Sequence, residues 1–91
     1  MNLQFTKDGD KWVASFTSAP AKQVIVQVIR AERGYFTVYA GIDGLTPVSI
    51  YNESLSGRKD ILLNVEVPEF CKLVFESSSE ILEAAYDLVE E

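Results

Sequence analysis

Apolar and polar residues alternate in several short segments of this chain, and this alternation constrains its fold more than any other feature. The pattern is clearest over residues 11–17, 35–42 and 61–67, while residues 24–29 form a β-branched run interrupted only by Gln27. A period of two is the signature of a β-strand with one buried face. The sequence therefore predicts an all-β fold with these residues inside: Trp12, Phe16, Val26, Val38, Leu63, Val65, Leu73 and Phe75.

Turn residues separate these segments at short intervals. Asp8-Gly9 separates Leu3–Lys7 from Lys11–Thr17 and predicts a β-hairpin. Residues 31–34, Ala-Glu-Arg-Gly, predict a second hairpin in which Gly34 takes a positive φ. Seven or eight short strands spaced in this way are typical of a two-layer antiparallel β-sandwich, of jelly-roll or immunoglobulin-like type. We expect residues 1–91 to form one such domain.

The last segment of the chain fits two kinds of structure. Ser77 and Glu80 match a helical capping box, which allows a short C-terminal helix. The residues Leu82, Ala84, Tyr86 and Leu88 also alternate as one face of a strand. We favour the strand, because a sandwich needs a final strand to cover one of its edges.

The chemistry open to the chain is narrow, because it contains no histidine and one cysteine, Cys71. A serine or cysteine nucleophile needs a nearby base, usually histidine, and a structural zinc site needs histidine or several cysteines. Asp8 and Asp10 lie on a turn, where such residues are common. Cys71 is in phase with Leu73 and Phe75, which predicts a buried, inert thiol. We therefore expect no catalytic residue, no metal, no cofactor and no enzymatic activity.

The net charge of −6 is unevenly distributed along the chain. Residues 1–59 carry a net charge of +2, whereas residues 60–91 carry −8. Nucleic-acid binding depends on clustered Lys and Arg, so an acidic chain of this kind predicts no nucleic-acid partner. The apolar runs are too short for a signal peptide or a membrane span, which predicts a cytoplasmic protein with no membrane partner.

Several aromatic residues are expected on the surface. If Phe36 and Val38 face the core, then alternation turns Tyr35 and Tyr39 outward, and Arg30 and Tyr51 are expected beside them. Exposed aromatic residues next to an arginine are typical of protein interfaces, and flat aromatic surfaces also stack on sugar rings. Arg30, Tyr35, Tyr39 and Tyr51 therefore form a candidate interface or ligand face. The alternative, that the tyrosines are half covered by the second sheet or by loops, stays open.

One segment carries a resemblance to known proteins. The sequence Phe-Thr-Lys-Asp-Gly-Asp-Lys-Trp-Val-Ala-Ser-Phe at 5–16 resembles the start of short proteins encoded among prophage structural genes. In those proteins a GDKWVAxF hairpin leads a compact β-sandwich, and the spacing of Gly34, Tyr39 and Lys72-Leu73-Val74 is similar too. The resemblance implies a role in a virion or its assembly, and a virion-associated location. It implies no particular functional residue.

Three functions are compatible with these features. The first is a non-enzymatic structural or interaction protein, such as a head or tail accessory subunit, that forms a homo-oligomer or binds other virion proteins. Self-association is expected because small domains without disulfides or metals often gain stability in this way. The second is a small carbohydrate-binding module that uses the tyrosine face. The third is a small hydrolase that uses paired carboxylates, which lacks the usual base.

Overall fold

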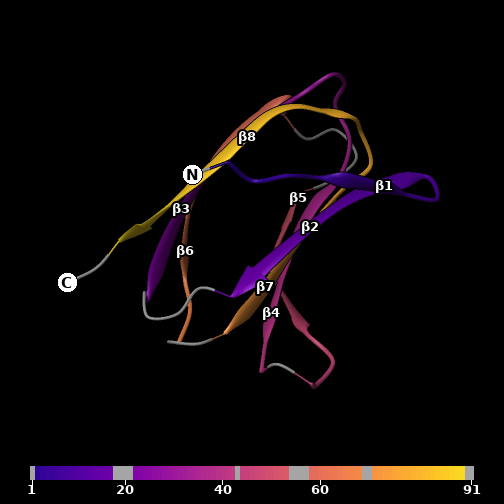
Figure 1. The fold of residues 1–91 in the computed structure, drawn as a ribbon. Helices are drawn as coiled ribbons and strands as arrows, with labels where there is room; N and C mark the ends of the chain where they lie inside the picture. The colour runs from indigo at the N-terminus through magenta and orange to yellow at the C-terminus, as the bar shows by residue number, and fades with distance from the viewer. Residues whose placement is uncertain (1, 18–21, 43, 54–57, 69–70, 90–91) are drawn as a thin grey trace.

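Two antiparallel sheets pack face to face in the computed structural model, which describes residues 2–17, 22–42, 44–53, 58–68 and 71–89 (Figure 1). The strands are β1 (Thr6–Asp8), β2 (Lys11–Thr17), β3 (Gln23–Arg30), β4 (Phe36–Gly41), β5 (Val48–Glu53), β6 (Asp60–Glu66), β7 (Lys72–Ser77) and β8 (Ile81–Val89). One sheet has the order β1-β2-β7-β4-β5 and the other has the order β6-β3-β8. The predicted all-β sandwich is confirmed, and the C-terminal segment is a strand rather than a helix.

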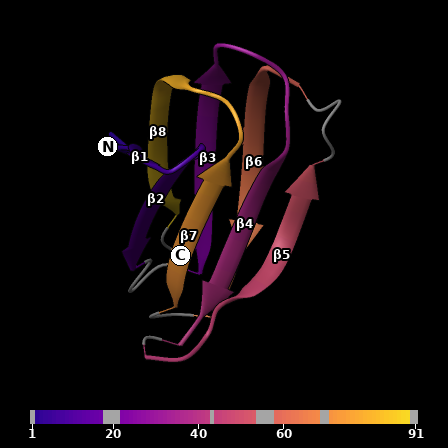
Figure 2. The same ribbon diagram turned by 90° about the vertical axis from the view of Figure 1, so that its right-hand side faces the viewer.

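The strand pairing follows the nested order of a jelly roll. β4 pairs with β5, β3 with β6, and β2 with β7. The outermost pair is completed by the N-terminal segment, because Asn2 forms a bridge with Ala85 of β8 and the Leu3 N–H donates to the Ala84 carbonyl at 3.2 Å. Such nesting arises when one long two-stranded ribbon folds across two layers. In Figure 2, β8, β3 and β6 lie behind β2, β7, β4 and β5.

The first predicted hairpin is present. β1 and β2 pair in antiparallel register, with Asp8 opposite Lys11 and two residues in the turn. Gly9 opens that turn with a φ of 66°. Tight two-residue hairpin turns need a positive φ at this position, and glycine adopts it without strain. The Asp-Gly signal therefore acts as the sequence predicts.

The second predicted hairpin is wrong, because β3 and β4 belong to different sheets. Residues 31–35 cross from the three-stranded sheet to the five-stranded sheet. Gly34 is also not one of the described glycines with a positive φ, which are Gly9 and Gly44. It is buried, and a Cβ atom there would overlap Ser78 Oγ, so the absence of a side chain at Gly34 allows Ser78 to pack closely against it.

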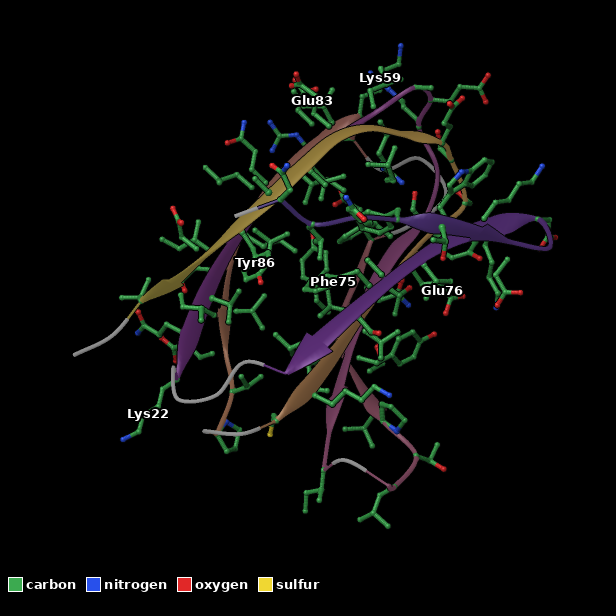
Figure 3. All side chains as sticks on the ribbon, viewed as in Figure 1. Lys22, Lys59, Phe75, Glu76, Glu83 and Tyr86 are labelled. Atoms are coloured by element: carbon green, nitrogen blue, oxygen red, sulfur yellow. The ribbon has the colours of Figure 1, made fainter. Side chains whose placement is uncertain are left out.

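The core lies between the sheets and is built mainly from β3, β4 and β7. Its fully buried members include Val24, Val26, Val28, Phe36, Val38, Leu73 and Phe75. The rings of Phe36 and Phe75 stack with 6.4 Å between their centroids. Figure 3 shows Phe75 and Tyr86 reaching into this layer from opposite sheets. The predicted burial of Val26, Val38, Val65, Leu73, Phe75 and Cys71 is confirmed, while Leu63 is partly buried against the same cluster.

Trp12 differs from its expected place. It is half-buried and does not belong to the buried core cluster. It lies opposite Lys7 in the β1–β2 hairpin, which projects from the body of the sandwich (Figure 1). The Lys7 ammonium lies 5.5 Å from the centre of the indole ring, in cation–π contact. The side chain of Phe16, the other aromatic residue expected on this face, lies outside the described part of the chain.

Candidate functional site

Arg30, expected on the outer tyrosine face, is buried between the sheets with 1 % of its surface exposed. Its guanidinium donates to the carbonyls of Tyr35 at 2.9 Å, of Gly34 at 3.1 Å, and of Arg58. It also lies 3.4 Å from Ser77 Oγ at the end of β7. The expectation that Arg30 belongs to an exposed face is therefore wrong. Arg30 therefore joins the β3–β4 connection to the end of β7, at Ser77, and to Arg58, which comes just before β6.

The buried charge of Arg30 has partners of several kinds. Burial lowers the pKa of its guanidinium, and the negative charge of Glu53 and the Tyr51 hydroxyl oppose that change. The guanidinium carbon also lies 5.9 Å from the centre of the Phe36 ring. Arg30 Nε has no hydrogen-bond partner among the described residues. Since the other nitrogens are occupied by the protein's own oxygens, Arg30 acts in the structure of this end of the sandwich.

Tyr51 also lies away from the expected face. It is opposite Val38, whose side chain is in the core, so Tyr51 faces inward and packs against the core. Its hydroxyl donates to Glu53 Oε2 at 2.7 Å, and the Arg58 N–H donates to Glu53 Oε1 at 3.2 Å. Burial, followed by the bond to Glu53, raises the pKa of the Tyr51 phenol. The expectation of an outward Tyr51 is therefore wrong.

The carboxylate of Glu53 should make the stability of this end depend on pH. The hydrogen bond from Tyr51 is the main cause that lowers the pKa of Glu53 below its ordinary value of 4.5. Because the pKa is lower in the folded protein than in the unfolded chain, the ionised carboxylate stabilises the fold at pH values above the unfolded pKa. That contribution is lost as the pH falls through the folded pKa. We therefore expect Glu53→Gln to lose less unfolding free energy on acidification than the wild-type protein does. The difference should be less than about 1 kcal/mol, because the carboxylate is partly solvated.

Urea unfolding between pH 6 and pH 3 would measure this contribution. Glu32→Gln, at an exposed position on the β3–β4 connection, is the matched control. Identical pH dependence in Glu53→Gln and Glu32→Gln would contradict the assigned role of Glu53.

Tyr35 and Tyr39 do lie on the outer face of the five-stranded sheet, as predicted. Both alternate in phase with Thr37, on the side of the strand that faces away from the core, and both are half-buried. Lys11 Nζ lies 3.1 Å from Glu76 Oε1 on the same face. Burial is the main cause that raises the pKa of Tyr35, and the charge of Glu76 adds to it. Tyr35 thus lies near an ion pair, and the role of the two tyrosines as an interface stays a prediction.

A second surface was not predicted from the sequence. It consists of exposed aliphatic side chains on β5 and on the β4–β5 connection, and we call it the β5 surface: Ile42 (68 % exposed), Leu45 (65 %), Val48 (64 %) and Ile50 (43 %). β5 is the edge strand of its sheet, and Figure 2 shows it at the right-hand side with the connection extending below. Residues 44–52 carry no charged side chain, which is the sequence signal for this surface.

The outer face of the three-stranded sheet has a different character. Asp60 and Glu83 lie on either side of Ile29, and Asp87 lies opposite Ile25 in the strand register. Glu83 is seen on the outer side of β8 in Figure 3. Leu62, which is 72 % exposed, is the most exposed large apolar residue of this sheet. The acidic half of the chain therefore places several carboxylates on this one face.

A groove of about 470 Å³ lies beside the N-terminal segment, lined by Asn2, Leu3, Gln4, Gln27, Ile29, Leu82, Glu83, Ala84 and Ala85. Within the described ranges, no group of three or more His, Cys, Asp or Glu side chains is placed to hold a metal ion. The same part of the chain contains no helix able to span a membrane. No protein family, curated protein or solved structure matches the chain in the comparisons with known proteins.

Proposed function

We propose that this protein is a non-enzymatic structural subunit that works by associating with further copies of itself. The observation that carries the proposal is the β5 surface, where four large aliphatic side chains are exposed within residues 42–50, three of them in the uncharged run 44–52. Contiguous exposed apolar surface on a small domain is typical of an interaction site. Burying these side chains against a second copy removes them from water, which favours association.

The setting that we propose is a phage or prophage virion, with the protein as a head or tail accessory subunit. Two features support it: the resemblance of the segment 5–16 to proteins from prophage structural genes, and the jelly-roll pairing of the strands. Jelly rolls are common in viral capsid proteins, which is an argument from analogy of fold. Other virion proteins are the alternative partners of the same surface.

The carbohydrate-binding alternative loses two of its four residues. Arg30 is buried and Tyr51 faces the core, so only Tyr35 and Tyr39 of that group remain on the outer face. Both are half-buried, and Tyr35 lies near the ion pair of Lys11 and Glu76, so the two do not form an open aromatic platform. The arrangement therefore favours protein association over stacking on sugars.

The molar mass in solution tests the proposal. We expect light scattering at micromolar concentration to give a multiple of the 10.2 kDa chain mass, in both low and high salt. Salt should have little effect because apolar contacts, unlike exposed ion pairs, are not screened. A monomer mass under both conditions would contradict self-association and favour a different partner.

A further inference from the structure

We infer that β5 pairs antiparallel with β5 of a second copy across a two-fold axis, so that two five-stranded sheets join edge to edge. The inference rests on the proposed self-association and specifies its contact. An edge strand leaves a row of backbone N–H and C=O groups free to pair with another chain. Antiparallel pairing of a strand with its own copy is self-complementary, as a two-fold contact requires.

The other edge strands are less suited to a second copy. β1 has three residues, and the N-terminal segment covers part of β8 through Asn2 and Leu3. Full-length antiparallel pairing of β6 with its copy would set Asp60 opposite Glu66 of the second copy, and this would happen twice. Like charges directly opposite each other across two strands are destabilising.

β5 avoids this repulsion because it carries one charged residue, Glu53, at its end. Full-length antiparallel pairing sets Glu53 opposite Val48 of the second copy, and the residues between them are uncharged. Val48 and Ile50 would then be covered at the contact. Edge strands that resist pairing usually carry lysine, proline, a β-bulge or inward-pointing charge. β5 has no lysine or proline; its one bulge leaves Ile50 unmatched between Ser49 and Tyr51, and its one charge, Glu53, is bonded by Tyr51 and Arg58 at the end of the strand.

Charge substitution on two exposed aliphatic residues tests the contact. Ile50→Lys places a charge on the β5 edge, while Leu62→Lys makes the same kind of change on the outer face of the other sheet. We expect Ile50→Lys to raise the dissociation constant of the oligomer at least tenfold, and Leu62→Lys to change it less than threefold. Circular dichroism and thermal melting of both variants would show that the fold is retained.

Cysteine cross-linking gives a readout that does not depend on adding charge. A disulfide forms readily only when the two Cα atoms lie within about 7 Å and the two Cβ atoms point toward each other. In the register that sets Glu53 opposite Val48, Ser49 of one copy lies directly opposite Asn52 of the other, and both residues lie on the outer face of the sheet. Under mild oxidation, we expect a mixture of Ser49→Cys and Asn52→Cys proteins to form a covalent dimer much faster than a mixture of Ser49→Cys and Leu62→Cys proteins. The wild-type protein is a suitable background, because its single cysteine, Cys71, is buried.

The outcomes separate the contact from the proposed function. If wild-type protein is oligomeric but Ile50→Lys associates equally well, or if the Ser49→Cys and Asn52→Cys mixture cross-links no faster than the Ser49→Cys and Leu62→Cys mixture, the β5 contact is wrong and self-association still stands. If wild-type protein is a monomer in light scattering, the proposed function itself fails. If Ile50→Lys does not fold, the comparison of the two cysteine mixtures decides the contact.

Discussion

Replacing Arg30 by methionine is expected to lower the free energy of unfolding by about 3–5 kcal/mol, because the buried acceptors that it serves lose their donor. The carbonyls of Gly34, Tyr35 and Arg58 all accept hydrogen bonds from this one guanidinium. Methionine has a similar length and is apolar, so the substitution tests the hydrogen bonds more than the packing. A loss of this size is a large share of the total stability of a small domain.

Urea denaturation followed by circular dichroism would measure this loss. Arg33→Met is the matched control, since Arg33 is exposed on the same connection, and it should change the free energy of unfolding by less than about 0.5 kcal/mol. Arg30→Lys should fall between the two, because lysine keeps the charge but lacks the planar fork that reaches several acceptors. Equal effects of Arg30→Met and Arg33→Met would contradict the structural role of Arg30.

The strands could be predicted from the sequence because alternation and turn residues agree over most of the chain. The Asp8-Gly9 hairpin is an example in which a local rule specifies the turn and its register. The final strand was predicted from alternation of Leu82, Ala84, Tyr86 and Leu88, although the capping residues before it also allowed a helix. In β8 the tertiary pairing with β3 outweighs that local preference.

The division of the strands between two sheets could not be predicted in the same way. Residues 31–34 have turn chemistry that suits either a hairpin or a crossing between layers. The burial of Arg30 distinguishes a crossing between layers from a hairpin. The sequence carries a signal for this burial, because Arg30 continues the series Val24, Val26 and Val28 on the inner face of β3. Arginine is rarely buried, so composition alone places it outside.

The position of Tyr51 shows a related limit. Its burial depends on which strand face meets the core, and the register shift in the β4–β5 pair changes the phase of β5 between Ser49 and Tyr51. Ser49 lies opposite the outward Tyr39, whereas Tyr51 lies opposite the inward Val38. A register shift is set by three-dimensional pairing, so alternation within the sequence of β5 does not reveal it.

Replacing Phe75 by alanine is expected to cost about 3–5 kcal/mol, whereas Trp12→Ala should cost about 1–2 kcal/mol. Phe75 is fully buried and stacks on Phe36 at the centre of the core, so its removal leaves a cavity that the surrounding strands cannot fill. Trp12 is the larger side chain, but it is half-buried in the projecting hairpin and keeps its contact with Lys7 near solvent. Its loss removes less apolar surface from the folded state and leaves no enclosed cavity.

The two alanine variants can be compared by their urea midpoints, provided that their denaturant slopes agree with the wild-type slope. Lys7→Ala, which removes the cation and leaves the indole in place, is the control for Trp12, and it should cost less than about 1 kcal/mol. If Trp12→Ala proves as costly as Phe75→Ala, then the indole belongs to the core. The inner face of β2 would then extend further toward the hairpin turn than its half-buried position indicates.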